Sequence, residues 1–220
     1  VGESLRLSQA GLHLSVRTDW GRATLDVPLL GRFNAANALA VLTALLVSGV
    51  PLDDACRALA HITPPPGRMQ TLGGGAQPMV VVDYAHTPDA LEKVLATLRE
   101  IVTGGRLICV FGCGGNRDRG KRPLMGAVAC RGADVVWLTS DNPRNEDPRH
   151  IIDAILAGCE GAPHVEPDRA RAIFEAIGEA RRGDVVLIAG KGHEDYQEVA
   201  GRKSYFSDVE VAQKALEAWT

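Results

Sequence analysis

The segment TSDNPRNEDP, from Thr139 to Pro148, places one arginine among acids and amides directly after the apolar run ADVVWL. An arginine guanidinium binds a carboxylate through two parallel hydrogen bonds, a geometry that lysine does not reproduce. Turn hydrogen bonds to the backbone could account for Asp141 and Asn142, but they give no reason for Arg144. Arg144 is therefore a candidate carboxylate-binding residue.

A second polar segment, GCGGNRDRGKRP, runs from Gly112 to Pro123. Its glycines allow the backbone to approach a ligand closely, and its cationic side chains predict that this ligand is an anion. The segment matches neither the GxGxxG dinucleotide fingerprint nor the GxxxxGK[ST] P-loop. The alternative is a glycine-rich turn that only reverses the chain. The four cationic residues are Arg117, Arg119, Lys121 and Arg122.

The segment GKGHEDYQ, from Gly190 to Gln197, resembles a phosphate cradle, but its two acids would repel a phosphate. A cation such as a substrate ammonium suits Glu194 better. His193 could be a base or a metal ligand, or a histidine that makes structural hydrogen bonds. Arg117 and Arg144 opposite Glu194 would bind a zwitterion, with its carboxylate at the arginines and its ammonium at the glutamate. The polar segments together predict an amino-acid site.

A fourth polar segment, DYAHTPD, begins at Asp83 directly after an apolar run. Pro88 suits the first position of a helix, and Thr87 suits the N-cap before it. Asp83 and His86 are then predicted to be exposed at the end of a strand, where Asp83 could accept hydrogen bonds from a ribose diol.

Four apolar runs precede these segments and alternate with helix-like stretches, which predicts an α/β domain with a doubly wound, mostly parallel sheet of the Rossmann-like kind. Ligands bind at the carboxyl ends of the strands in such sheets, so the four polar segments should share one edge. The runs are MVVVDY, RLICVFG, ADVVWLTS and DVVLIAG, and the helix-like stretches are about 88–101, 121–131, 148–158 and 168–181.

The N-terminal part has a different pattern. Apolar and polar residues alternate from Leu5 to Leu30, which predicts a small antiparallel sheet. Two helices are predicted next, one from near Asn34 and one in LDDACRALAHI. Three successive prolines in TPPPGR then break the pattern. We expect a first domain over 1–62, a proline-rich hinge at 63–67 and a second domain over 68–220.

Composition narrows the class of protein. The 220 residues are 45% hydrophobic with a net charge of -3, which offers no electrostatic footprint for nucleic acid. No apolar run reaches the length of a membrane span, and no leader opens the chain, so a cytoplasmic protein is expected. The five cysteines form no CxxC pair and indicate neither a disulfide framework nor a zinc site. The chain begins at Val1 rather than methionine, from which we expect a fragment of a longer protein.

The motifs together resemble the Mur ligase family of peptidoglycan synthesis, over nearly the whole chain. They occur in the order in which the family has them, and DNPR is the mark of its diaminopimelate-adding members, whereas lysine-adding members differ there. The motifs are GRFNAANALA, PPGRM, VVDYAHTPDAL, FGCGGNRDRGKRPLMG, DNPR and AGKGHEDYQ.

The resemblance implies roles for particular residues. Those implied for ATP are Asn34, Asn37, Arg68, Asp83 and His86. Those implied for meso-diaminopimelate are Arg117, Asn142 and Arg144 at the distal carboxylate, Asp141 nearby, and the Gly190 carbonyl with Glu194 at the distal ammonium. No catalytic residue and no metal ligand is assigned in this chain.

The resemblance also implies a reaction. ATP, with Mg²⁺, would phosphorylate a carboxylate of UDP-MurNAc-L-Ala-D-Glu, and the diaminopimelate amine would attack the acyl phosphate. Residues 1–62 would be the end of the central α/β ATPase domain, and 68–220 would be the C-terminal domain of a monomeric enzyme. Because no GxxxxGK[ST] occurs in the sequence, we expect the chain alone to be inactive.

Three alternatives remain open from the sequence. The first is a ligase of the same superfamily that adds L-lysine or glutamate. The second is a substrate-binding module or one half of a split enzyme. The third is a doubly wound domain whose loops have only structural roles.

Overall fold

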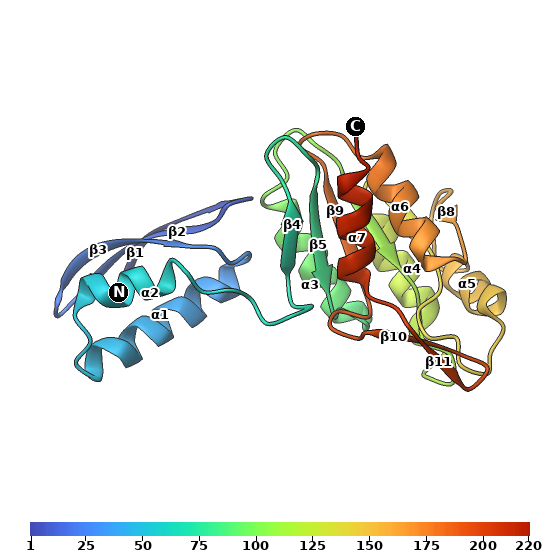
Figure 1. Cartoon of the computed structure of the whole chain (residues 1–220), viewed down its shortest axis with the longest axis horizontal. Coiled ribbons are helices and arrows are strands. Elements are labelled where there is room, and N and C mark those ends of the chain that lie inside the picture. Colours follow the sequence, from blue (N-terminus) through green and yellow to red (C-terminus); the bar gives the residue numbers. More distant parts are fainter. The chain divides into compact units, whose positions relative to one another are not determined.

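The computed structural model describes all 220 residues, and the chain divides into two compact units, Val1–Pro64 and Pro65–Thr220 (Figure 1). The first unit combines a three-stranded sheet with two helices, and the second is built on a six-stranded sheet. No helix in either unit has both the length and the apolar character needed to cross a membrane.

The first unit is an antiparallel meander packed against a pair of helices, as the alternating pattern predicts. Alternate side chains of the central strand, Leu12, Leu14 and Val16, are buried with Leu42 and Leu46 of the first helix. Side chains two residues apart lie on one face of a strand, so one face of this sheet meets the helices. The elements are β1 (Gly2–Ser8), β2 (Gly11–Thr18), β3 (Gly21–Val27), α1 (Arg32–Val47) and α2 (Leu52–Leu59).

The second unit contains a six-stranded sheet of order β4-β5-β9-β6-β7-β8, in which only β4 is antiparallel. The mostly parallel, doubly wound α/β fold expected from the sequence is thus confirmed. The strands are β4 (Gln70–Gly73), β5 (Met79–Asp83), β6 (Leu107–Phe111), β7 (Val135–Leu138), β8 (His164–Val165) and β9 (Val185–Ala189). The helices are α3 (Pro88–Arg99), α4 (Lys121–Gly132), α5 (Pro148–Leu156), α6 (Arg169–Glu179) and α7 (Asp208–Glu217).

Helices cover both faces of this sheet, which is why its central strands are unbroken apolar runs. Val80 and Val82 of β5 pack in one cluster with α6 and α7, so Val81 between them points to the opposite face. All three side chains are fully buried. Figure 1 shows α7 in front of β5 and β9, with α3 behind the sheet. Parallel sheets occur almost only with both faces covered in this way.

The strand order reverses direction once. After β5 the chain forms β6, one strand position away, and continues outward to β7 and β8. It then returns, and β9 fills the position between β5 and β6. Because crossovers between parallel strands are right-handed, helices of the outward path and of the return path lie on opposite faces. The reversal leaves a crevice at the carboxyl ends of β5, β9 and β6, where ligands bind in open α/β sheets.

The predicted helices and the four long strands are present with their ends shifted by at most a few residues. Thr87 caps α3 by accepting a hydrogen bond from the Ala90 N–H at 3.3 Å, with Pro88 at the first helical position, as predicted. The sequence patterns did not predict β4, β8, α7 or the hairpin of β10 (Tyr196–Val199) and β11 (Arg202–Tyr205). These strands are two to four residues long and lie at an edge or at the surface, so they carry little apolar periodicity.

Candidate functional site

The four polar segments lie at one edge of the sheet. Asp83 of β5 and Phe111 of β6 both pair with Ala189 of β9, and Phe111 also pairs with Leu138 of β7. The last residues of four neighbouring parallel strands are therefore in register. Asp83 is itself the first residue of one polar segment, and each of the other three is followed directly by one, so the expected shared edge is present.

A pocket of about 420 Å³ opens among these segments. Of the eleven residues that the sequence suggested for ATP or diaminopimelate, six line it: His86, Arg117, Asp141, Asn142, Arg144 and Glu194. The pocket therefore holds both cationic and anionic side chains, as binding of a zwitterion requires. Its other lining residues are Tyr84, Thr87, Gly112, Cys113, Gly114, Asp118, Lys121 and Tyr196.

Asn142 joins the DNPR segment to the segment after β9. Its side-chain Nδ2 donates to Oε2 of Glu194 at 2.8 Å, and its Oδ1 accepts from Nζ of Lys191 at 3.1 Å. Oδ1 also accepts from the backbone N–H of Glu198 at 2.9 Å. Asn142 is only 1% exposed. It therefore orients the Glu194 carboxylate in this structure, in addition to the ligand contact implied by the resemblance.

Arg144 lies in the left-handed backbone region, with φ of 52°, and the β10–β11 hairpin holds that backbone. The Arg144 N–H donates to the Glu198 carbonyl at 2.9 Å, and the Arg144 carbonyl accepts from the Ala200 N–H at 2.6 Å. The guanidinium Nη1 donates to the Gly115 carbonyl at 2.9 Å, and Nε lies 3.5 Å from Oε2 of Glu198. Nη1 and Nε of Arg144 therefore already have partners within the protein.

Glu146 fastens the DNPR segment to the glycine-rich segment. Its carboxylate is paired with Arg122 at 3.0 Å and with Arg119 at 3.3 Å, and it accepts from the N–H of Asn116. The hydrogen bond from Arg122, followed by that from Asn116, lowers the pKa of Glu146 to about 2. Arg119 and Arg122 therefore neutralise an acid of the protein, and only Arg117 and Lys121 of the predicted cationic set line the pocket.

Asp83 is buried at the end of β5, although the sequence suggested an exposed side chain. Its Oδ2 accepts from the Met69 N–H and its Oδ1 from the Ala85 N–H, both at 2.8 Å. Burial raises the pKa of Asp83, while these two N–H groups and the charge of Arg68 act to lower it. The carboxylate therefore ties the segment before β4 to the segment after β5, and each of its oxygens accepts a hydrogen bond from the backbone.

The other residues implied for ATP are divided between the two units. Asn34 and Asn37 lie on α1 and are hydrogen-bonded to each other, from Nδ2 of Asn37 to Oδ1 of Asn34 at 3.1 Å. In the second unit the Arg68 guanidinium lies 4.8 Å from the ring centre of Tyr84, and the His86 ring lies 4.6 Å from it. Arg68, Tyr84 and His86 thus form one cluster within the second unit.

Gly190 lies where only glycine fits. Its φ is 114°, a conformation that residues with a side chain rarely adopt, and a Cβ there would be 2.8 Å from Oδ2 of Asp141. Gly190 does not line the pocket itself; its backbone lies against the carboxylate that does. The sequence patterns missed the role of Lys191, whose side chain is fully buried and donates from Nζ to Asn142 and Glu194.

A buried ion pair lies behind the site. Arg169 and Asp208 are both fully buried and are joined by two hydrogen bonds, of 2.7 and 2.8 Å. Arg169 also donates to the carbonyls of Ser140 and Ala189, at 3.2 and 3.0 Å. These carbonyls immediately precede Asp141 and Gly190 in the chain. The arginine thus clamps two of the segments that form the pocket.

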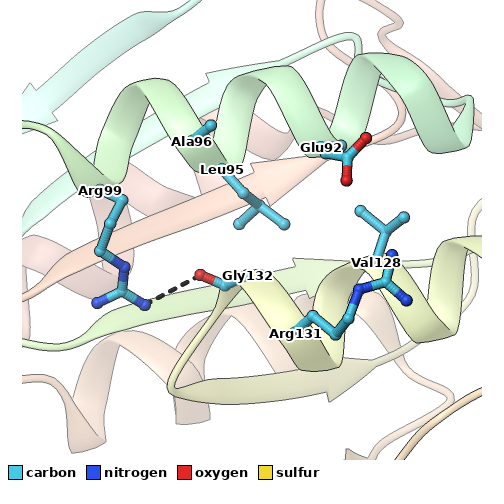
Figure 2. Close-up of a pocket in the computed structure, with 7 residues that line it drawn as sticks. All are labelled: Glu92, Leu95, Ala96, Arg99, Val128, Arg131 and Gly132. Carbon is cyan, nitrogen blue, oxygen red and sulfur yellow. Dashed lines mark hydrogen bonds between the residues drawn. The ribbon is translucent and has the colours of Figure 1, made fainter.

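A second groove, of about 260 Å³, lies between α3 and α4. Figure 2 shows Leu95 of α3 and Val128 of α4 projecting into the space between the helices, and Arg99 donating to the Gly132 carbonyl at 2.9 Å. Its charged residues lie around apolar side chains and do not converge on a point. This groove results from helix packing and is not a candidate active site.

The structure brings together no group of three or more histidine, cysteine, aspartate or glutamate side chains that could hold a metal ion. We therefore assign no step of a reaction to a metal held by these residues.

Comparison with known proteins identifies close relatives. A family model described as "Mur ligase, glutamate ligase domain" matches residues 67–192. The UDP-N-acetylmuramoyl-L-alanyl-D-glutamate--2,6-diaminopimelate ligase of Chromobacterium violaceum is 60% identical over 98% of this chain. The enzyme of the same name from Pseudomonas aeruginosa is 54% identical over 97% of this chain. The chain spans 44% of the length of each.

Solved structures agree with this relation. The structure of a UDP-N-acetylmuramoyl-L-alanyl-D-glutamate--2,6-diaminopimelate ligase matches 99% of this chain and 45% of its own, with a TM-score of 0.81 and 43% identity. Folylpolyglutamate synthase of Thermotoga maritima covers 86% of this chain with a TM-score of 0.68 at 21% identity. The second likeness is one of fold alone.

Proposed function

The chain belongs to the Mur ligase family, and we propose that it binds the incoming amino acid of a ligase that adds meso-diaminopimelate to UDP-MurNAc-L-Ala-D-Glu. One observation carries the proposal: the DNPR segment and Glu194 are joined through Asn142 in one pocket that Arg117 also lines. The relatives named for diaminopimelate at 54–60% identity support this choice of substrate.

The charges in the pocket suit one end of diaminopimelate, which carries a carboxylate and an ammonium on the same carbon. Arg117 and Arg144 would bind the carboxylate, and Glu194 with Asp141 would bind the ammonium. Anchoring this distal end leaves the amine at the other end free to attack. Positioning of this kind replaces an encounter in solution with a reaction between held groups.

Selectivity follows from the same contacts. L-Lysine has the distal ammonium but no distal carboxylate, so it would leave the ligand-binding nitrogens of Arg117 and Arg144 without a carboxylate. A site that is built to hydrogen-bond a polar group can reject an analogue that lacks it by roughly 10⁴-fold.

ATP would supply the activation of the acceptor carboxylate as an acyl phosphate. Of the residues suggested for the nucleotide, His86 lines the pocket and Arg68 lies over Tyr84 in the second unit, while Asn34 and Asn37 belong to the first. Assignment of 1–62 to a central ATPase domain and of 68–220 to a C-terminal domain belongs to this proposal. So do a cytoplasmic location and a monomeric state.

The test is an NMR titration of the chain with meso-diaminopimelate and, in parallel, with L-lysine. We expect diaminopimelate to shift the side-chain signals of Arg117 and Arg144 and the amide signal of Glu194, and lysine to leave the arginine signals unchanged. Equal binding of both would overturn the assignment and favour a lysine-adding ligase. Binding of neither would mean that this chain does not form the amino-acid site by itself.

A second test concerns turnover. The sequence contains no GxxxxGK[ST] motif, and we propose that the chain alone neither hydrolyses ATP nor forms product. Phosphate release would be measured with all substrates and Mg²⁺ present. Turnover by the purified chain would refute this part of the proposal and would show that nucleotide activation is achieved by residues described here.

A further inference from the structure

Glu198 is a side chain that neither the motifs nor the proposed substrate contacts include, and yet it touches the central arginine of the site. It lies on β10, and its carboxylate Oε2 is 3.5 Å from Nε of Arg144. Both side chains are largely buried, at 23% exposed for Glu198 and 18% for Arg144. A pair so shielded from water is screened less than one at the open surface.

The three guanidinium nitrogens of Arg144 have different surroundings. Nε faces Glu198, and Nη1 donates to the Gly115 carbonyl at 2.9 Å and more weakly to the Asn142 carbonyl at 3.5 Å. Nη2 has no hydrogen-bond partner in the protein, and Arg144 lines the pocket. Nε and Nη1 therefore hold the guanidinium within the protein, and Nη2 is left for a ligand.

We propose that Glu198 is a positioning residue that orients Arg144 so that its Nη2 faces the pocket and can bind the distal carboxylate of the amino-acid substrate. The proposal rests on the proposed function and deepens it, because it explains how selectivity for a dicarboxylic amino acid depends on the β10–β11 hairpin. Glu198 does not itself touch the substrate. Its negative charge would repel a carboxylate, so Glu198 would favour substrate binding only by orienting Arg144.

The structure separates the side-chain role of Glu198 from its backbone role. The Glu198 N–H donates to Oδ1 of Asn142, and the Glu198 carbonyl accepts from the Arg144 N–H. Gln197 also donates from Nε2 to the Asp141 carbonyl at 2.9 Å. These bonds persist when only the Glu198 side chain is changed, so the hairpin stays attached. The guanidinium then loses its ion pair at Nε and keeps only the Nη1 contacts with the Gly115 and Asn142 carbonyls.

The first measurement is calorimetric titration of the whole chain with meso-diaminopimelate and with L-lysine. We expect Glu198→Ala to weaken diaminopimelate binding roughly 5- to 30-fold, because the partly buried ion pair that orients Arg144 is lost. L-Lysine affinity should stay unchanged, since lysine has no group for Arg144. Glu198→Gln keeps an acceptor oxygen for Nε and should restore most of the affinity. Glu217→Ala, an exposed glutamate on α7, is the matched control.

The second measurement needs no ligand. The Nε–H signal of Arg144 in an NMR spectrum should exchange slowly with water in the wild-type chain and in Glu217→Ala, and rapidly in Glu198→Ala. Unchanged exchange in Glu198→Ala would overturn the proposal, because the arginine would then be held without Glu198.

The outcomes separate this inference from the proposed function. Binding of neither amino acid by the wild-type chain would count against the proposed function, and the exchange rate would still decide whether Glu198 holds Arg144. If the wild type prefers diaminopimelate and Glu198→Ala keeps the same preference, the proposed function stands and the positioning role is refuted. A loss of preference that Glu198→Gln restores supports both.

Discussion

Asn142 and Glu194 are 52 residues apart in the sequence and are joined by a hydrogen bond of 2.8 Å from Nδ2 to Oε2. The bond connects the loop after β7 to the loop after β9, strands that are not neighbours in the sheet. The Asn142 amide thus donates to the Glu194 carboxylate, which we propose binds the substrate ammonium. Orientation of that carboxylate therefore depends on a residue of the DNPR segment.

Replacing Asn142 by aspartate should weaken the binding of every ligand with a distal ammonium. The change is nearly isosteric, but it replaces the Nδ2 donor with an oxygen that repels Glu194. We expect affinity for both diaminopimelate and L-lysine to fall at least tenfold, since a buried pair of like charges disfavours the ionised carboxylate. Calorimetry on Asn142→Asp, and on Asn145→Asp at an exposed neighbouring position, would check this, and equal affinities in the two variants would contradict it.

Replacing Arg144 by lysine should weaken binding of the ligand's distal carboxylate and leave binding of its distal ammonium unchanged. Lysine keeps the charge but cannot make the planar set of contacts with Gly115, Glu198 and a ligand. We expect a loss of roughly tenfold to a hundredfold for diaminopimelate, from loss of a charge-assisted hydrogen bond, and none for L-lysine. Arg182→Lys, on the segment after α6, is the control. A parallel loss for both ligands would mean that the variant disturbs the whole pocket.

Replacing Gly190 by alanine should cost stability and displace Asp141. The backbone conformation alone costs on the order of 1–3 kcal/mol, and the added Cβ also meets Oδ2 of Asp141 at 2.8 Å. Gly161→Ala is a matched control, because its φ of 104° is similar and nothing lies within 4 Å of its Cβ position. Urea unfolding should show the larger loss for Gly190→Ala. Equal losses would mean that the loop adjusts without moving Asp141.

Acid stability should depend on Glu146. Its pKa is about 2 in the folded protein and 4.5 as an ordinary value, so the carboxylate stabilises the fold fully above pH 4.5. That contribution is lost as the pH falls from 4.5 towards 2, because the unfolded chain takes up the proton more readily. Unfolding in urea, measured from pH 6 to pH 2.5, should show a shallower loss for Glu146→Gln. A parallel pH dependence in the two proteins would exclude the role.

Removing one partner of the Arg169–Asp208 pair should destabilise the fold strongly, whereas removing both should destabilise it little. Arg169→Met leaves the Asp208 charge buried without a partner, which costs about 3–5 kcal/mol. The double variant Arg169→Met with Asp208→Leu removes both charges and should recover most of this loss. Urea unfolding of both variants gives the comparison. A double variant as unstable as the single one would show that the bonds to the Ser140 and Ala189 carbonyls are what the fold requires.

Local signals sufficed for several parts of the site. Thr87 and Pro88 were identifiable as a helix start because a cap acts on its own first turn. The loops after β5, β6, β7 and β9 could be assigned to one edge because four apolar runs alternating with helices leave few topologies. The charge types of Arg117, Arg144 and Glu194 then indicated a zwitterion before any geometry was known.

The roles of Lys191, Glu198 and Glu146 could not be predicted in this way. Lys191 lies opposite Asn142 at a separation of 49 residues, and Glu198 contacts the same side chain from 56 residues away. Glu146 is paired with Arg122, 24 residues earlier. Each looks like an ordinary surface charge in the sequence, because nothing local marks which charges the fold will bury together.

The sequence by itself determined the elements, the doubly wound sheet and the chemical character of the loops, because hydrophobic period, turn residues and charge act over a few neighbouring residues. Only the tertiary structure decided which charges face the pocket and which neutralise one another. Arg117 and Arg144 line the pocket, whereas Arg119 and Arg122 are paired with Glu146. The physical reason is that a side chain's partner depends on the distance between strand ends, which the packed sheet sets and the order of residues does not.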